Sequence, residues 1–231
     1  MKKYKHLFFD LDKTLYDFEK SSESTFRDFF DIYHLENKGV NSFQKFIETY
    51  RRINLMLWAI YREGGIKKEV LNIKRFDLAL QEFGIHDTIL ATRIAEYYVN
   101  KSPLKKTLFP GVIKTLNYLE NKYHMHIITN GFEEVQWKKL RASNLRKYFD
   151  KVITSEEAGC KKPDKGIFIY SLTQANAKIG ESLMIGDDLI VDIKGAHAAG
   201  IDQVFVNYSN NSHGEEVTYE IQHLEELMKI L

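Results

Sequence analysis

Two carboxylates stand two positions apart near the start of the chain, where Asp10 and Asp12 follow the apolar run 7–9. In an extended segment, residues i and i+2 point to the same side, so both can face one bound molecule. Asp187 follows a second apolar run, 183–185. Carboxylates this close raise one another's pKa unless a cation lies among them. Oxygen-rich sites with room for phosphate and water suit Mg²⁺, so the acids predict a magnesium site for a phosphate-bearing substrate.

A hydroxyl and a lysine complete the set of residues that could do chemistry. Thr129 and Asn130 end an apolar run and precede a glycine, and Lys162 stands before a proline. Taken singly, these features also fit an acidic turn, a plain turn, a helix N-cap at Asp187 and Asp188, and a solvated lysine. Their occurrence together, in the order expected along the chain, favours a catalytic site.

Short apolar runs rich in Ile, Val and Phe predict the elements that position these residues. The runs show no polar alternation, as in strands buried on both faces of a sheet. Strands that alternate with helices indicate an α/β fold with a doubly wound parallel sheet, where ligands bind at the carboxyl ends of the strands. The predicted strands are 7–9, 126–129, 151–154, 183–185 and 203–206, and the predicted helices are 111–123, 133–145, 165–177 and 191–199.

The segment 19–102 interrupts this alternation directly after the first acids. It contains no proline, and its apolar and aromatic residues recur at helical spacing, which predicts a unit of four or five helices. Pro103 marks the return to the α/β part. We therefore expect an α/β core of residues 1–18 and 103–231, an all-helical insert at 19–102, and a short closing helix at 220–231.

Composition excludes several classes of protein. The 231 residues carry 33 Lys and Arg against 32 Asp and Glu, which gives no basic field to favour nucleic acid as a partner. Cys160 is the only cysteine, so no intrachain disulfide can form. No stretch approaches the roughly 18 apolar residues that span a bilayer, and the first apolar run is too short for a signal peptide. These features predict a cytoplasmic protein without a membrane partner, and they leave the oligomeric state open.

Three histidines, His6, His124 and His126, lie before or within predicted strands, at the end opposite the acids. They lack the i, i+4 pairing of a helical metal site. We therefore interpret them as ordinary surface and strand-edge histidines.

Four segments of the chain resemble the motifs of the haloacid dehalogenase-like (HAD) hydrolase superfamily, and the helical insert resembles its C1 cap. Finer features resemble the pyrimidine 5′-nucleotidase subgroup: residues 8–10, 127–132, the run 155–159 leading to Lys162, and the insert segment 54–58 followed by Gly64. The segments that carry the superfamily resemblance are 10–14, 128–131, 162–163 and 186–192.

The resemblance implies a role for each acid. Asp10 would attack phosphorus and become an aspartyl phosphate, which divides one difficult displacement into two easier ones. Asp12 would protonate the leaving alkoxide and then act as base for the hydrolytic water. The Asp10 carboxylate, the Asp12 backbone carbonyl and Asp187 would hold Mg²⁺.

The remaining motif residues receive supporting roles from the same resemblance. Thr129 and the Asn130 backbone N–H would bind a phosphoryl oxygen, and Lys162 would neutralise the charge that nucleophile and phosphate bring together. Asp192 would orient Lys162 or a metal-bound water. Asp188 could compete with its neighbour as a metal ligand, although the motif favours Asp187.

The second acid also bears on the reaction class. Dehalogenases of the superfamily lack a residue like Asp12 and need no metal, so its presence favours phosphoryl chemistry. The preferred hypothesis is a Mg²⁺-dependent nucleoside 5′-monophosphatase with a pyrimidine preference. The alternatives are a sugar-phosphate or phosphoglycolate phosphatase, a phosphoglucomutase-type phosphoryl transferase, or a binding module that retains the fold with little activity.

Substrate specificity would reside in the insert, which in such enzymes closes over the site. Trp58 could stack on a base, with Tyr61 and Arg62 beside it, and Phe18 lies where the chain enters the insert. Aromatic residues on a helical stripe also fit simple core packing, so contact with a base and packing in the core are both open interpretations of these residues.

Overall fold

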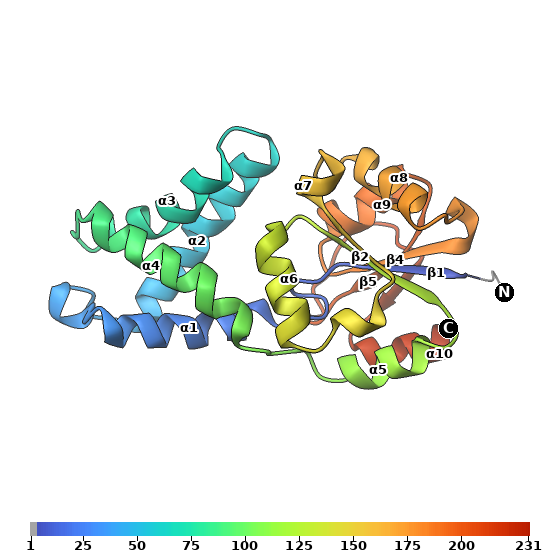
Figure 1. Cartoon of the computed structure of the whole chain (residues 1–231), viewed down its shortest axis with the longest axis horizontal. Coiled ribbons are helices and arrows are strands. Elements are labelled where there is room, and N and C mark those ends of the chain that lie inside the picture. The colour runs from blue at the N-terminus through green and yellow to red at the C-terminus, as the bar shows by residue number, and fades with distance from the viewer. Residues whose placement is uncertain (1–3) are drawn as a thin grey trace. The chain divides into compact units, whose positions relative to one another are not determined.

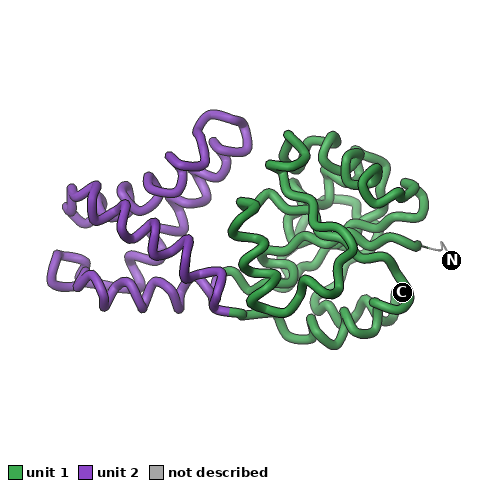
Figure 2. Tube along the Cα trace, in the orientation of Figure 1, with its two compact units in different colours: residues 1–18, 106–231 green, residues 19–105 purple. Residues whose placement is uncertain are grey.

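The computed structural model describes residues 4–231, which divide into two compact units (Figure 2). One unit comprises residues 4–18 and 106–231, and the other Glu19–Lys105. Whether the second, helical unit acts as a cap remains a prediction. No helix in residues 4–231 is long and apolar enough to cross a membrane.

The first unit is built on a parallel sheet, as predicted. Its strand order within the described residues is β3-β2-β1-β4-β5-β6, and every neighbouring pair is parallel. The first strand therefore lies at the centre, between the strands that precede Asn130 and Asp187. The strands are β1 His6–Phe9, β2 His124–Thr129, β3 Lys151–Thr154, β4 Ser182–Gly186, β5 Asp202–Val206 and β6 Tyr219–Ile221.

Helices cover both faces of the sheet (Figure 1). Phe8 and Phe9 are fully buried in two different hydrophobic clusters, because successive residues of a strand face opposite sides. Phe9 belongs to the cluster that α5 and α10 cover, and Phe8 to the cluster that α8 and α9 cover. The helices are α5 Val112–Leu119, α6 Glu133–Ala142, α7 Ser155–Ala158, α8 Lys165–Gln174, α9 Gly195–Ala198 and α10 Leu227–Ile230.

The second unit contains the α-helices α1 Phe18–Ile32, whose first residue still belongs to the first unit, α2 Phe43–Arg62, α3 Lys68–Gln81 and α4 Thr88–Lys101. Its core is aromatic. Phe26 on α1 packs against Tyr50 on α2 with ring centroids 4.6 Å apart, and Tyr50 stacks on Phe76 of α3 at 5.0 Å. The aromatic stripes of the sequence thus hold these helices to one another.

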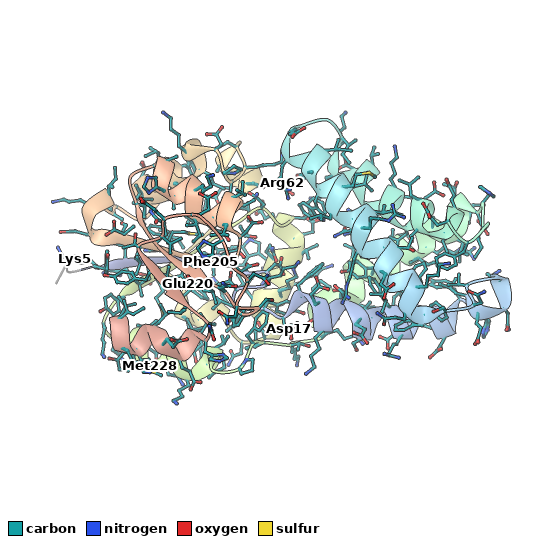
Figure 3. All side chains as sticks on the ribbon, turned by 180° about the vertical axis from the view of Figure 1, so that it is seen from behind. Lys5, Asp17, Arg62, Phe205, Glu220 and Met228 are labelled. Carbon is teal, nitrogen blue, oxygen red and sulfur yellow. The ribbon has the colours of Figure 1, made fainter. Side chains whose placement is uncertain are left out.

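The predicted closing helix at 220–231 is wrong in its first part. Residues Tyr219–Ile221 form β6, which pairs with β5 so that Glu220 lies opposite Phe205, and both side chains are labelled in Figure 3. Only Leu227–Ile230 forms an α-helical turn. An edge strand of three residues has no periodicity of its own, and its pairing with β5 overrides local preference.

The three histidines meet at the amino ends of the central strands. His6 Nδ1 lies 3.2 Å from His126 Nε2, and the His6 and His124 rings stack at 5.1 Å. His126 is only 2% exposed. Burial, together with the neighbouring His6, lowers the pKa of His126 to about 4. His124 Nδ1 pairs with Asp150. Among residues 4–231, the group of side chains that could hold a metal ion contains none of these histidines. The interpretation as surface or strand-edge histidines is wrong for His126, which is buried within β2.

We expect the His126 imidazole to make stability pH-dependent. The unfolded state binds a proton near pH 6.5 and the folded state only near pH 4, so stability falls as the pH drops through this window. The loss approaches about 2 kcal/mol by pH 5. Urea unfolding at pH 7.5 and 5.0 should show that His126→Phe loses less stability on acidification than the parent, whereas the exposed-site control His86→Gln behaves like the parent. Equal losses in all three proteins would contradict this prediction.

Candidate active site

Asp10 directly follows β1 and lies in the interior of the first unit. It is 7% exposed, and its backbone N–H donates to the Ile185 carbonyl oxygen of β4 at 2.9 Å. Its Oδ1 accepts a hydrogen bond from Lys162 Nζ at 2.6 Å. Burial raises the pKa of Asp10 to about 7, against the lowering effect of the lysine. The carboxylate is therefore desolvated and held by one cation, as a nucleophile needs to be.

Lys162 connects two buried carboxylates. Its side chain is 1% exposed, and Nζ donates to both Asp10 Oδ1 and Asp192 Oδ1 at 2.6 Å. Burial would lower the pKa of this ammonium, but the two carboxylates outweigh that effect and raise the pKa above its usual range. Lys162 therefore remains protonated, and Asp192 fixes it beside Asp10.

The Asn130 side chain anchors the segment that carries Lys162. Its amide donates to the Lys162 carbonyl oxygen and its own oxygen accepts from the Lys162 N–H, each at 2.8 Å. The Lys162–Pro163 peptide bond is cis. The sequence predicts a phosphate contact for Asn130 through its backbone N–H, and the structure adds a side-chain role that sequence reasoning missed: it ties the end of β2 to the lysine.

A group of three carboxylates forms at the ends of β1 and β4. Ligand atoms of Asp10, Asp187 and Asp192 all lie within 4.8 Å of one another. Burial raises the pKa of Asp187 well above its usual range, and the other two acids raise it further. Lys162 balances only part of this negative charge, so the oxygen donors fit a hard divalent cation such as Mg²⁺. Both oxygens of Asp192 already accept hydrogen bonds, Oδ1 from Lys162 Nζ and Oδ2 from the Asp188 N–H, which favours Asp10 and Asp187 as the side chains to hold the cation.

Asp188 caps the following helical turn. Its Oδ1 accepts from the backbone N–H groups of Ile190 and Val191, each at 2.9 Å. Asp188 is not part of the three-carboxylate group within the described residues. The N-cap interpretation therefore accounts for its geometry. The preceding Gly186 packs so closely on Asp192 that a Cβ at this position would overlap the carboxylate.

The carboxylate of Asp12 contacts two side chains of α6, and among the described residues it is not part of the three-carboxylate group. Lys139 Nζ lies 2.5 Å from Asp12 Oδ1 and 2.7 Å from Oδ2, and Gln136 Nε2 lies 2.8 Å from Oδ2. Any contribution of Asp12 to a metal site would therefore come from its backbone carbonyl. Sequence reasoning missed both α6 residues. The available signal was their spacing of three residues on a predicted helix, next to the apolar Leu140.

Thr129 ends β2 with a hydroxyl that is almost fully buried. Its Oγ1 accepts from the Gly131 N–H at 3.0 Å and from Gln136 Nε2 at 2.9 Å. Both contacts use the oxygen as acceptor, so the hydroxyl proton remains available for a phosphoryl oxygen. A Cβ at Gly131 would overlap the Gln136 amide, which explains the glycine in this motif.

Two further residues near the three-carboxylate group were absent from the sequence prediction. Thr14 Oγ1 donates to Asp187 Oδ1 at 2.8 Å, and the Tyr208 hydroxyl donates to the Thr14 carbonyl oxygen at 2.8 Å. Thr14 thus orients one carboxylate, and Tyr208 orients Thr14. The signal for Thr14 was its place four residues after Asp10, within the first motif.

Of the four proposed pocket residues, Phe18 belongs to the first unit and the other three lie on α2 of the second unit. The Phe18 ring centroid lies 5.4 Å from Lys139 Nζ. Trp58 and Tyr61 meet edge to face at 5.4 Å on α2, and Tyr61 is only 7% exposed. Trp58 and Arg62 are half-buried. The structure thus places Tyr61 in the packed interior of the helical unit and leaves the other two partly accessible.

A buried arginine in the helical unit was also not identified from the sequence. Arg75 is 4% exposed and donates to the side-chain oxygens of Asn54 at 3.3 Å and Asn72 at 3.0 Å. Its guanidinium lies 5.0 Å from the Tyr98 ring centroid. Among the described residues it has no carboxylate partner. Apolar periodicity does not reveal a charged residue on the inner face of a helix.

Comparisons with known proteins agree with this fold. A family model described as haloacid dehalogenase-like hydrolase matches residues 7–206. The HAD hydrolase YfnB of Bacillus subtilis is 32% identical over 100% of this chain and 97% of its own. A crystal structure of YfnB bound to magnesium gives a TM-score of 0.88 at 30% identity and 99% coverage of both chains.

Two relatives have names that state a substrate. The pyrimidine 5′-nucleotidase YjjG of Escherichia coli is 30% identical and covers 99% of this chain and 98% of its own. The glyceraldehyde 3-phosphate phosphatase of Methanocaldococcus jannaschii is 32% identical and covers 98% of this chain and 96% of its own. Both relatives act on small phosphorylated molecules.

Proposed function

Because the chain belongs to the haloacid dehalogenase-like hydrolase family, we propose that it is a Mg²⁺-dependent phosphomonoester hydrolase with Asp10 as nucleophile. The observation that carries this proposal is the pairing of Lys162 with Asp10 and Asp192 at 2.6 Å beside the carboxylate of Asp187. This group combines a buried nucleophile, a fixed cation and oxygen ligands for a metal. Such a combination suits phosphoryl transfer, where electrostatic stabilisation dominates.

The reaction proceeds in two displacements in this proposal. A carboxylate oxygen of Asp10 attacks phosphorus, the bond from phosphorus to the leaving oxygen breaks, and Asp12 gives that oxygen a proton. Water then attacks the aspartyl phosphate while Asp12 takes a proton from that water, the bond from phosphorus to the Asp10 oxygen breaks, and inorganic phosphate leaves. A bound Mg²⁺, held by Asp10, Asp187 and the Asp12 carbonyl, would neutralise phosphoryl charge in both steps.

The other site residues position the phosphate and neutralise its negative charge. Lys162 offsets negative charge as the phosphate approaches Asp10, and Asp192 keeps the ammonium in place. The Thr129 hydroxyl donates to a phosphoryl oxygen, helped by the Asn130 N–H. Because these groups are buried and held before substrate arrives, little reorganisation is needed during the reaction.

The favoured substrate is a nucleoside 5′-monophosphate with a pyrimidine base. The resemblance of residues 127–132, 155–159 and 54–58 to that subgroup supports this choice, as does the similarity to YjjG. We propose Trp58 and Arg62 as base contacts and Phe18 as a contact near the first motif. Tyr61 stays a weaker candidate because it is buried. The M. jannaschii relative supports a triose-phosphate or other sugar-phosphate substrate as the second candidate.

Phosphate release from a panel of monophosphates tests this proposal. We expect turnover of pyrimidine nucleoside 5′-monophosphates with Mg²⁺, and a loss of at least about 100-fold in EDTA that Mg²⁺ restores, because the unneutralised carboxylates repel the phosphate. A metal-dependent preference for sugar phosphates or phosphoglycolate would retain the reaction and change the substrate. Phosphate release slower than substrate loss would favour phosphoryl transfer to a sugar, and no turnover of any ester would favour the binding-module hypothesis.

A further inference from the structure

Lys139 and Gln136 form a clamp on the acid–base residue of the proposed reaction. Lys139 is 3% exposed, and its ammonium contacts both oxygens of Asp12 at 2.5 and 2.7 Å. A lysine so deeply buried normally requires a partner that offsets its desolvation. Asp12 is that partner, although the Asp12 side chain itself is 27% exposed. The pair therefore joins a buried cation to a carboxylate that solvent and substrate can reach.

Gln136 extends the clamp to the phosphate-binding hydroxyl. One nitrogen, Nε2, contacts both Asp12 Oδ2 at 2.8 Å and Thr129 Oγ1 at 2.9 Å. The Gln136 side chain is fully buried, and among the described residues its Oε1 has no hydrogen-bond partner. A buried acceptor without a partner costs stability. Gln136 therefore leaves one acceptor without a partner, while its Nε2 holds the Asp12 carboxylate and the Thr129 hydroxyl at a fixed separation.

Aromatic rings confine the ammonium of Lys139 on another side. The ring centroids of Tyr16 and Phe18 lie 5.2 and 5.4 Å from Nζ, close enough for cation–π attraction. Tyr16 is fully buried. The Lys139 ammonium therefore has little freedom to turn away from Asp12. Because it contacts both carboxylate oxygens, it restricts rotation of the Asp12 carboxylate.

We propose that Lys139, assisted by Gln136, is a positioning residue that sets the orientation in which Asp12 exchanges protons with the leaving group and with water. This inference rests on the proposed function, since it assigns a role to a residue that acts through Asp12. Proton transfer depends on reach and alignment. If the Asp12 carboxylate loses its orientation, we therefore expect the largest rate losses for substrates whose leaving group requires protonation.

Leaving-group dependence tests the proposal. kcat/KM covers the steps up to departure of the leaving group, and p-nitrophenolate departs without much help from an acid, whereas an alkoxide needs one. With Mg²⁺ present, we expect Lys139→Met to lower kcat/KM about 100-fold on a nucleoside 5′-monophosphate and less than about 5-fold on p-nitrophenyl phosphate. Lys139→Arg should restore most of the loss. Gln136→Leu should combine a smaller selective loss with an equal loss on both esters, because it also releases the Thr129 hydroxyl.

Controls separate this role from damage to the fold. Lys138→Met, the neighbouring lysine on α6, should leave both esters unaffected, and melting temperatures identify any variant that fails to fold. In an Asp12→Asn background, Lys139→Met should cause no further selective loss, because it acts through the missing acid. Equal losses on both esters, or an undiminished selective loss without Asp12, would overturn the proposal. An inactive parent protein would instead refute the proposed function.

Discussion

Asp10→Asn is expected to reduce phosphate release by at least about 10⁴-fold, because nothing else in the site can form the covalent intermediate. The amide keeps the shape of the carboxylate but cannot attack phosphorus. Lys162 retains Asp192 as a partner in the variant, so the ammonium does not lose its charge balance. Phosphate release from the best substrate of the panel, at saturating Mg²⁺, measures the effect.

The same substitution should leave the fold intact. It removes one of three clustered carboxylates. Burial raises the pKa of Asp10 to about 7, and the charge of Asp192 acts in the same direction. In EDTA we therefore expect a melting temperature equal to or above that of the parent protein. Asp150→Asn is the matched control, since that acid is exposed and pairs with His124. Substantial residual turnover in the Asp10 variant would remove this residue from the role of nucleophile.

Sequence reasoning could place the acids because parallel strands end at one edge of a sheet. β1 and β4 are neighbours in register, with Phe9 opposite Ile185, so Asp10 and Asp187 had to meet once both strands were identified. Thr129 follows from the pairing of β1 with β2 in the same way. Backbone register thus determines the positions of these residues with no knowledge of side-chain packing.

The α6 clamp could not be predicted by that route. Lys139 and Gln136 reach Asp12 across more than a hundred residues of sequence, and their direction depends on how α6 packs against the sheet edge. A lysine on a helix is usually solvated, and no periodicity distinguishes a buried one. Arg75 was missed for the same reason, because its partner Asn54 on α2 reaches it only through the packing of α2 against α3.

Asn130 illustrates a third kind of limit. Its place at the end of β2 follows from the sequence, but its side chain holds the backbone of Lys162, 32 residues away. A motif identifies the residue, whereas the loop conformation decides which of its groups is used. The consequence is that the lysine's position depends on β2 as well as on its own segment.

Lys162→Met is expected to reduce activity and stability together. Removing the ammonium leaves Asp10 and Asp192 buried without the cation that both contact at 2.6 Å. Breaking a buried ion pair from one side typically costs about 3–5 kcal/mol. The pKa of Lys162 is raised in the folded state, so its stabilisation is fully present at neutral pH and is lost only as the pH rises past that raised value.

The catalytic loss should be about 10³-fold in kcat, because one fixed charge at the phosphoryl group is removed. Lys165→Met is the matched control: this exposed lysine begins α8 three residues further on and should change neither property. Steady-state kinetics with Mg²⁺ and urea unfolding at pH 7.5 measure the two effects. If the variant lost activity but kept the stability of the parent, another cation would have to balance Asp10 and Asp192. Lys162 would then support catalysis and not the fold. Full activity would instead show that the phosphate is neutralised elsewhere.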